Sequence, residues 1–337
     1  MSEGIPAGRG GFVTALDVAR RAGVSRSAVS RTFTPGASVS EPVRRKVVAA
    51  AEELGYSVNR LARSLHGAPS DLVALVVSNL SEPFIATQLD ALSAALMERG
   101  LHTLLLNAGA RDMSALMTLV LEYRVRAVVV LSGAPPAEIV EQCQRGNQRM
   151  ILVNRDAGGM VVDRIRTQDV GGSRMAGEHF LARGRRRPVV IRSAARTPTR
   201  LRRAQGFLAR MDEAGIACRE IADGADDYAA GAAAARALLP DGLVDAAFCV
   251  TDRTALGFLN TARHELGVAV PDDVAVIGFD GIAEAGWPSH ALTTVAQSVP
   301  DFVQAVVRIL ETPREGPGTG DGLSLEVPVQ LVVRGSS

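Results

Sequence analysis

Residues 13–31, VTALDVARRAGVSRSAVSR, predict two short helices joined by a tight turn. Thr14 stands directly before the first helical pattern and Asp17 follows three residues later, which is the spacing of a capping box. Gly23 allows a left-handed backbone that a side chain would resist. Ser25 then stands in the cap position of a second helix, RSAVSRTF. A capped helix, a glycine turn and a second capped helix are typical of a helix-turn-helix unit.

The second helix has a polar face suited to DNA. Its outer side carries two arginines and two serines, namely Arg26, Ser27, Ser30 and Arg31. A helix of this size fits the major groove, which is about 12 Å wide. Arginine can pair bidentately with guanine, and serine can reach a base edge or a phosphate. The alternative is an ordinary amphipathic hairpin whose charged face is solvated.

Two further helical patterns follow. Ser40 stands in the cap position of a third helix, EPVRRKVVAAAEEL at 41–54. Asn59 can cap a short helix, RLARSLH, in which Ala62 and Leu65 lie near one face. A helix this short is not stable alone in water. It is therefore either a linker helix packed on a neighbour or a segment that folds on DNA and inserts an apolar wedge into the minor groove.

Charge is unevenly distributed along the 337 residues. The net charge is +1, but residues 1–68 hold ten Lys and Arg against five Asp and Glu, so this segment is +5 and the remainder is −4. A basic head on an acidic body indicates a polyanionic partner for the head. The length predicts two or three units, and 47% apolar with 22% charged residues is the balance of a globular protein.

The composition disfavours several classes of protein. The longest apolar runs, such as 72–77 and 127–131, are strand-sized and shorter than the roughly 18–20 residues that span a bilayer. The N-terminal MSEGIPAGRGGF lacks the apolar core of a signal peptide, so we expect a cytoplasmic protein with no membrane partner. Cys143, Cys218 and Cys249 form no CxxC motif and the histidines show no metal-ligand spacing, so we expect reduced thiols, no metal and no cofactor.

From residue 72 onward, strand-like and helical patterns alternate. The strand-like segments are 72–79, 102–107, 127–131, 150–154, 188–192, 217–221, 246–250 and 274–279. The helical segments lie near 84–99, 112–123, 137–145, 172–183, 201–214, 228–239 and 253–266. This alternation predicts parallel sheets with helices on both faces. There are too many units for one sheet, which favours two α/β lobes with a ligand cleft between them.

Ordered blocks along nearly the whole chain resemble the LacI/GalR family of bacterial transcriptional regulators. The blocks are VTALDVARRAGVSRSAVSR, VSEPVRRKVVAAAEELGYSVNRLARSL, LVALVVSNLSEPFIA, AGEHFLARGRRRP, RRAQGFLARMDEAGI, TDRTALGFL, GVAVPDDVAVIGFDGI, ALTTVAQSV and LVVRGSS. The resemblance implies an N-terminal all-α helix-turn-helix headpiece, a hinge helix and a two-lobed α/β body that is periplasmic-binding-protein-like and dimerises. The implied bounds are 1–58 for the head, 59–70 for the hinge helix and linker, and 71–335 for the body. Within the body, the N-lobe comprises about 71–165 and 297–322. The C-lobe comprises about 166–296 and 323–335.

The resemblance also implies which residues contact DNA. The positions where the family reads bases hold Arg26, Ser27 and Arg31, and those where it contacts phosphates or bases hold Thr14, Ser25 and Ser30. The hinge positions are Asn59 at the helix start, Leu65 at the minor-groove wedge and Ala62 beside it. Two-fold protein symmetry requires a pseudo-palindromic double-stranded operator, so we expect a homodimer or a tetramer on such a site.

In the cleft, the positions that match the family's effector-binding residues are Phe84, Asn154, Arg155, Arg203, Asp252 and Asp280. Acids, arginine and an aromatic suit a sugar or related polyol, because each hydroxyl both donates and accepts hydrogen bonds. Thr251 departs from the asparagine common in the family, and residues 225–227 lack its usual aromatic, for which Tyr228 is a candidate replacement. These departures leave the identity of the effector open.

Together these features predict a nucleoid-associated repressor of carbohydrate uptake or catabolism genes, whose affinity for DNA is controlled by a sugar-like effector. A solute-binding protein for transport would use the same body, but the basic head and the lack of a signal segment argue against it. An enzyme of sugar metabolism is a further alternative. The sequence shows no nucleophile elbow, P-loop or GxGxxG after the first strand, so we expect no catalytic residues.

Overall fold

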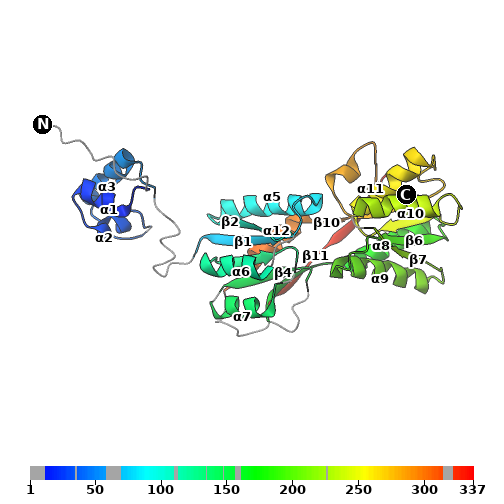
Figure 1. The fold of residues 1–337 in the computed structure, drawn as a ribbon, viewed down its shortest axis with the longest axis horizontal. Helices are drawn as coiled ribbons and strands as arrows, with labels where there is room; N and C mark the ends of the chain where they lie inside the picture. Colours follow the sequence, from blue (N-terminus) through cyan, green and yellow to red (C-terminus); the bar gives the residue numbers. More distant parts are fainter. Residues whose placement is uncertain are drawn as a thin grey trace. The chain divides into compact units, whose positions relative to one another are not determined.

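The computed structural model of the chain describes residues 12–34, 36–57, 70–109, 113–133, 135–146, 148–155, 161–224, 227–313 and 322–337. The chain divides into two compact units, Met1–Ser70 and Asp71–Ser337, here called the head and the body (Figure 1). Among the described residues, no helix is long and apolar enough to cross a membrane.

In its described residues, the head folds as three helices. They are α1 (Ala15–Ala22), α2 (Arg26–Thr32) and α3 (Glu41–Leu54). Val18, Val29 and Val47 contribute one fully buried side chain from each helix to a common core. The predicted third helix is confirmed, but the expected cap is wrong in one respect, because the Ser40 side chain makes no cap hydrogen bond. Pro42 in the first turn removes one of the N–H groups that a cap would otherwise satisfy.

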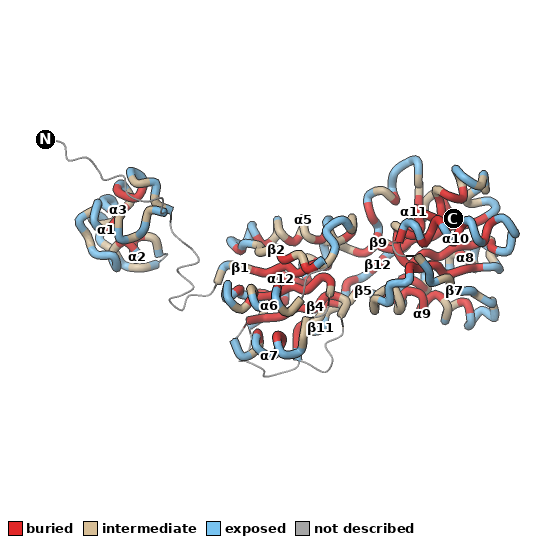
Figure 2. Tube along the Cα trace, in the orientation of Figure 1, coloured by how far each residue is buried: buried red, intermediate tan, exposed pale blue. Residues whose placement is uncertain are grey.

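The first lobe of the body, the N-lobe, contains a parallel sheet in the order β11-β5-β4-β3-β1-β2. Its strands are β1 (Leu72–Val77), β2 (His102–Asn107), β3 (Ala127–Val130), β4 (Arg149–Val153), β5 (Asp163–Thr167) and β11 (Ser324–Val327). Its helices are α5 (Pro83–Glu98) and α12 (Val299–Glu311) on one face, with α6 (Met113–Glu122) and α7 (Ala137–Arg145) on the other. The inner strands are buried on both faces, which explains their continuous apolar runs (Figure 2).

The second lobe, the C-lobe, repeats this plan with the strand order β12-β10-β9-β8-β6-β7. Its strands are β6 (Pro188–Arg192), β7 (Arg219–Ala222), β8 (Ala246–Cys249), β9 (Ala275–Asp280), β10 (Thr293–Gln297) and β12 (Val329–Val332), of which β12 is antiparallel to β10. Its helices are α8 (Asp169–Ala182) and α9 (Pro198–Glu213) on one face and α10 (Asp227–Leu238) and α11 (Asp252–Asn260) on the other, with a π-helical turn at Thr261–Glu265 and a 3-10 turn at Ala283–Gly286. Two α/β lobes with helices on both faces are therefore confirmed.

Between the described elements of the two lobes, the chain crosses at Gln168, Ser298 and Pro328. These crossings are bonded to one another, because the backbone N–H of Gln168 donates to Val327 O at 3.1 Å and that of Ser298 donates to Pro328 O at 3.4 Å. The lobes are thus joined by three adjacent crossings beside the carboxyl ends of the strands, and the crossing at Ser298 runs in the opposite direction to the other two. A cleft that opens there is well placed to respond to a bound molecule.

Two expectations for the body need correction. We predicted residues 323–335 in the C-lobe, but β11 pairs with β5 in the N-lobe sheet, and the chain enters the second sheet only after Pro328. Strand β5 itself lies in a segment predicted as a loop. Its sequence, DRIRT, does not resemble a strand because the buried Asp163 is polar. The carboxylate of Asp163 is accommodated by Arg149, whose Nε donates to Oδ2 at 2.6 Å, and by the backbone N–H of Leu323, which donates to Oδ1 at 2.9 Å.

Candidate functional site

The turn between α1 and α2 is fixed by local contacts. Asp17 N donates to Thr14 Oγ1 at 3.4 Å, and Thr14 N donates to Asp17 Oδ2 at 2.9 Å, which completes the predicted capping box. Gly23 has a left-handed φ of +66°. Ala28 N donates to Ser25 Oγ at 3.2 Å, so Ser25 caps α2. The predicted caps and turn of the helix-turn-helix unit are therefore confirmed.

Helix α2 presents a polar face to solvent. Arg26, Ser27, Ser30 and Arg31 are all exposed. Arg31 reaches back along the helix and its Nη2 donates to Ser27 Oγ at 3.4 Å, and the hydroxyls of Ser25 and Ser27 lie 2.9 Å apart. The Arg26 side chain makes no hydrogen bond or ion pair with any residue that the structure describes. Its guanidinium N–H groups are therefore available to a ligand such as DNA. This face can hydrogen-bond both base edges and phosphates.

Three predicted DNA contacts, Asn59, Ala62 and Leu65, lie outside the described residues. Their roles stay predictions. Thr14 is exposed at the start of α1, as a phosphate contact requires, although its hydroxyl already donates to Asp17 Oδ2 at 2.6 Å.

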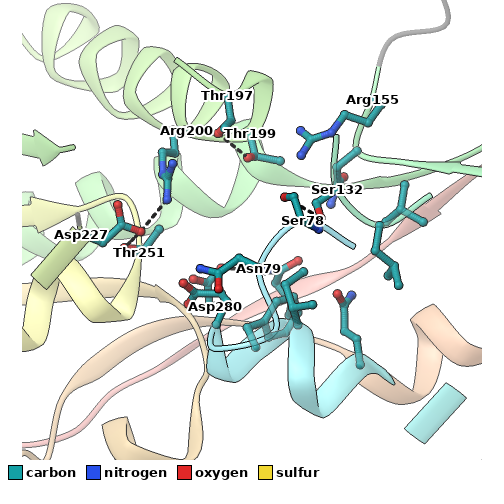
Figure 3. Close-up of a pocket in the computed structure, with 18 of the residues that line it drawn as sticks. Ser78, Asn79, Ser132, Arg155, Thr197, Thr199, Arg200, Asp227, Thr251 and Asp280 are labelled. Carbon is teal, nitrogen blue, oxygen red and sulfur yellow. Dashed lines mark hydrogen bonds and ion pairs between the residues drawn. The ribbon is translucent and has the colours of Figure 1, made fainter. Parts of the chain in front are cut away.

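A cavity of about 270 Å³ lies between the N-lobe and the C-lobe (Figure 3). Ser78 and Asn154 line it directly after β1 and β4, Ser132 lines it two residues after β3, and Asp280 lines it at the end of β9. Carboxyl ends of parallel strands are where α/β proteins bind ligands. The predicted cleft is therefore present, and the polar groups in it decide what it can bind.

Five of the six predicted effector-binding residues line this cavity, namely Phe84, Asn154, Arg155, Arg203 and Asp280. The sixth, Asp252, does not, and its prediction is wrong. Its side chain has no exposed surface, and its carboxylate accepts hydrogen bonds from the backbone N–H of Gly281 (2.7 Å) and Ile282 (2.9 Å) and from the hydroxyl of Thr294. Asp252 thus fixes the turn that follows Asp280 instead of contacting a ligand.

The buried environment of Asp252 changes the pKa of its carboxyl group. Burial, together with the neighbouring Asp280, raises the pKa of the Asp252 carboxyl to about 7, although the three hydrogen bonds act to lower it. The candidate replacement aromatic, Tyr228, is also not among the cavity residues. Its side chain is exposed, and its hydroxyl accepts a hydrogen bond from Asn260 Nδ2 at 3.1 Å.

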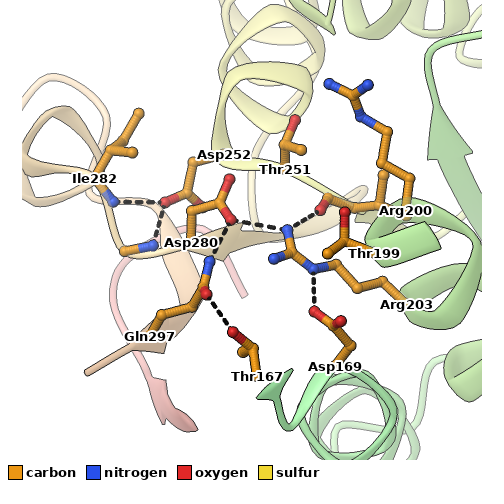
Figure 4. A network of polar contacts seen from close by, with 12 residues as sticks. Thr167, Asp169, Thr199, Arg200, Arg203, Thr251, Asp252, Asp280, Ile282 and Gln297 are labelled. Carbon is orange, nitrogen blue, oxygen red and sulfur yellow. Dashed lines mark hydrogen bonds and ion pairs between the residues drawn. The ribbon is translucent and has the colours of Figure 1, made fainter. Parts of the chain in front are cut away.

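Arg203 is the centre of a buried polar network in the C-lobe (Figure 4). Its Nε donates to Asp169 Oδ1 at 2.9 Å, and its Nη1 donates to Asp280 Oδ1 at 2.8 Å and to Val250 O at 2.9 Å. The guanidinium also stacks 3.7 Å from the ring centroid of Phe279. Burial alone lowers the pKa of Arg203, but Asp280 and Asp169 raise it above its ordinary value, so the group stays charged.

A chain of hydrogen bonds continues from this network to the N-lobe. Gln297 Nε2 donates to Asp280 Oδ1 at 2.8 Å, and Gln297 Oε1 accepts from the hydroxyl of Thr167 at 2.9 Å. Thr167 in turn is held by the Asn154 side chain, which accepts from Thr167 N at 2.7 Å and donates to its Oγ1 at 3.1 Å. Asn154 has a left-handed φ of +55°. Asp280 is therefore coupled to the first lobe through two strands that end at the lobe crossings.

A second ion pair borders the cavity at the start of α10. Arg200 Nη2 lies 2.5 Å from Asp227 Oδ2, which also accepts from the hydroxyl of Thr251 at 3.3 Å (Figure 3). Thr251 caps α11 through Thr254 N. Threonine at this position therefore has a local structural role and also lines the cavity.

Glu82, at the start of α5, faces these groups from the N-lobe. Its Oε2 lies 3.7 Å from Arg253 Nη1 in the C-lobe, and its Oε1 is buried without a hydrogen-bond partner. The pKa of Glu82 is raised to about 7, chiefly by burial and also by Asp280 and Asp227, while Arg253 and Arg200 act to lower it. An ionised Glu82 is thus poorly solvated in this cavity.

We expect Glu82→Gln to stabilise the body at pH 8 by about 1–2 kcal/mol and to have little effect at pH 5. The folded state binds the proton more tightly than the unfolded state, so the wild type loses stability as the pH rises from about 4.5, the ordinary pKa of a glutamate, to about 7. Glutamine resembles the protonated acid and avoids this loss. Thermal unfolding at both pH values measures it, with the exposed Glu311→Gln as control. An equal effect at both pH values would contradict the expectation.

Several cavity residues were not predicted from the sequence, namely Glu82, Arg200, Asp227 and Gln297. Each is a polar residue at the start of a helix or the end of a strand on the cleft side. That position is the signal that could have identified them, once the alternation of strands and helices had been recognised. No group of three or more His, Cys, Asp or Glu in the described part of the chain is placed to hold a metal ion.

Two family profiles match the chain. The one described as bacterial regulatory proteins, lacI family, matches residues 14–59, and the one described as periplasmic binding protein-like domain matches residues 178–337. The first therefore covers the helix-turn-helix unit, and the second covers most of the C-lobe. The second match also includes α12 and β11, which belong to the N-lobe.

Similar proteins are regulators rather than enzymes, in agreement with the prediction. The HTH-type transcriptional regulator GalS of Salmonella typhimurium is 31% identical over 88% of this chain and 89% of its own length. The HTH-type transcriptional repressor PurR of Proteus mirabilis is 30% identical over 96% of this chain and 97% of its own length. The structure of the Lac repressor dimer bound to operator shares the fold, with a TM-score of 0.83, 24% identity, and coverage of 97% of this chain and 99% of its own. The chain belongs to the lacI family of bacterial transcriptional regulators.

Proposed function

We propose that the protein is a cytoplasmic, nucleoid-associated repressor of carbohydrate uptake or catabolism genes, with a sugar-like effector in the cleft. The observation that carries the proposal is the exposed face of α2, which presents arginine and serine side chains to solvent on a capped helix-turn-helix unit. The effector class is supported by the cleft, where Asp280 and Arg203 offer acceptors and donors beside Phe84. It is also supported by the solved complex of the regulator CelR with cellobiose, which is 28% identical with a TM-score of 0.67.

The proposed mechanism couples the cleft to the head. A ligand that binds Asp280 and Asn154 together favours one spacing of the lobes, because the two residues lie at opposite ends of the Gln297–Thr167 hydrogen-bond chain. The changed spacing alters the fit of the heads and of the hinge residues Asn59, Ala62 and Leu65 to DNA. A coupling free energy of about 1–3 kcal/mol would change DNA affinity by about 5–150-fold.

The proposal includes a homodimer, because a pseudo-palindromic operator presents two equivalent half-sites. The edge strand β2 exposes Leu105, and Met97 of α5 is also exposed. Exposed apolar side chains beside an open strand edge can form the contact surface for a second copy of the chain.

The test is recovery of fragmented genomic DNA by the purified full-length protein, followed by sequencing. Enrichment of a pseudo-palindrome beside carbohydrate genes supports the proposal. Enrichment beside genes of another class would retain the regulator and refute the carbohydrate assignment. No enrichment, with or without a mixture of metabolites, would refute sequence-specific regulation.

Arg26→Ala is expected to weaken binding to the recovered site by about 5–150-fold, which corresponds to losing about 1–3 kcal/mol of base recognition. It is also expected to reduce discrimination at one base pair of each half-site. Fluorescence anisotropy at fixed salt measures both effects. Arg236→Ala, which removes an exposed arginine paired with Glu265 in the body, is the charge-matched control. Equal affinities of the two variants would exclude Arg26 as a base contact.

A further inference from the structure

We propose that one end of the cleft is an anion subsite, so that the effector is a hydroxylated small molecule carrying a phosphate or a carboxylate. This deepens the proposed function and rests on it only in taking the cleft as the effector site. The residues that carry the inference are Arg155, Ser132, Ser78 and Thr199, all of which line the cavity (Figure 3).

The first observation concerns the position and the partners of the Arg155 side chain. Its Nε donates to Gly133 O at 3.0 Å, which anchors the side chain, and Figure 3 shows its guanidinium directed into the cavity. Toward the residues that the structure describes, its two terminal nitrogens make no hydrogen bond or ion pair. Of the arginines that line the cavity, Arg200 is paired with Asp227, and Arg203 with Asp280 and Asp169. Arg155 is the lining arginine whose charge is not balanced by a described acid.

The charges near Arg155 are of the same sign. Burial lowers the pKa of Arg155, and the neighbouring Arg202 and Arg200 lower it further. A half-buried guanidinium beside two others costs free energy in the empty cleft, and a bound anion would offset that cost. Charge-assisted hydrogen bonds between arginine and phosphate or carboxylate are short and strong, and their geometry is frequently bidentate.

Hydroxyl groups complete a set of donors at this end. Ser132 Oγ accepts from both the backbone N–H and the hydroxyl of Ser78, so its own hydroxyl proton is left to donate. Thr199 lies in the first turn of the 16-residue helix α9, whose first turn contains no acidic residue and whose N-cap, Thr197, makes no side-chain cap hydrogen bond. The N-terminal N–H groups of such a helix add partial positive charge. Donors from three segments therefore converge beside Arg155.

The opposite end of the cavity has the complementary chemistry. Asp280, Asp227 and Glu82 supply carboxylate oxygens there, which suit hydroxyl groups rather than an anion. A ligand with an anionic group at one end and hydroxyls at the other would match both ends at once. A neutral sugar would leave the charge of Arg155 without a partner.

Thermal unfolding of the full-length protein in sodium phosphate, compared with sodium chloride at equal ionic strength, tests the subsite directly. We expect phosphate in the millimolar range to raise the Tm of the wild type. We expect Arg155→Gln to weaken the apparent phosphate affinity at least about tenfold. The control Arg236→Gln removes an exposed arginine of the body and should keep the full response. No phosphate response in the wild type, or an equal response in Arg155→Gln, would overturn the inference.

Asp156 follows Arg155 in the sequence and lies outside the described residues, so a second variant is informative. Asp156→Asn is expected to keep or strengthen the phosphate response. If phosphate acts only on this variant and not on the wild type, Arg155 is already neutralised by its neighbour and the subsite does not exist.

Calorimetric titration with glucose, glucose 6-phosphate and gluconate then separates the two sources of the anion. Binding of the phosphate ester alone or of the carboxylate alone assigns the source, provided that Arg155→Gln weakens it. Binding of glucose with unchanged affinity in Arg155→Gln would refute the anion subsite and leave the proposed regulator intact. Failure of the wild type to recover a specific DNA site would refute the regulator, whatever the result with phosphate.

Discussion

Replacing Arg203 with alanine is expected to lower the free energy of unfolding of the body by about 3–5 kcal/mol. The change leaves Gln297 as the side chain that still donates to Asp280, and it removes one of the two arginines that neutralise Asp169. Asp280 and Asp169 are both buried, so each would keep a charge with too few partners. The variant also loses the contact between the guanidinium and Phe279. Urea-induced unfolding, followed by circular dichroism over the transition of the body, measures the loss.

A matched control is Arg174→Ala. Arg174 of α8 is ion-paired with Glu213 of α9 at 2.6 Å, between the same two helices that Arg203 and Asp169 connect. Its pair is exposed, so the control is expected to cost about 0–1 kcal/mol. If both variants lose the same amount, the buried network contributes no more than a surface pair, and its role in holding the cleft would be refuted.

The features of the head were predictable because they depend on contacts between residues close in sequence. Thr14 and Asp17 are three residues apart, as are Ser25 and Ala28, and Gly23 needs only its own backbone conformation. Such pairs form in nearly any context that allows a helix to start. Sequence patterns therefore located the helix-turn-helix unit almost to the residue.

The cleft was predictable only in part, because its contacts join residues far apart in the chain. The resemblance located Arg203 and Asp280 but could not separate Asp280 from Asp252, since both are acids close to the ends of C-lobe strands. Only the fold shows that Asp252 is enclosed by Gly281, Ile282 and Thr294. Glu82 was missed for the same reason, because its surroundings come from the opposite lobe.

A second large effect is expected from Gly257→Ala, which should destabilise the body by about 3 kcal/mol. Helices α10 and α11 cross at Gly231 and Gly257, where a Cβ on Gly257 would overlap the backbone carbonyl of Tyr228 and one on Gly231 would overlap that of Thr254. Backbone atoms on the opposite helix cannot rotate away as a side chain can, so the helices must separate. Packing at interior density leaves no space for this shift without cost.

The control for this prediction is Gly171→Ala. Gly171 is also helical, but a Cβ there meets no atom within 4 Å. Alanine favours a helix over glycine by about 1 kcal/mol, so the control should be neutral or stabilising. Thermal unfolding of both variants separates the effect of the helix crossing from that of helix propensity. Equal stabilities would mean that α10 and α11 adjust freely.

The same crossing bears on the cleft, which makes Gly257→Ala informative about function as well. Asp227 begins α10 and Thr251 caps α11, and the hydroxyl of Thr251 donates to Asp227 across the two helix starts at 3.3 Å. Separation of the helices would lengthen this contact and release Arg200, which depends on Asp227 for its position. Gly257→Ala should therefore weaken effector binding even at temperatures where the body stays folded. Unchanged effector affinity in the folded variant would show that the starts of α10 and α11 are positioned by the sheet rather than by the glycine crossing.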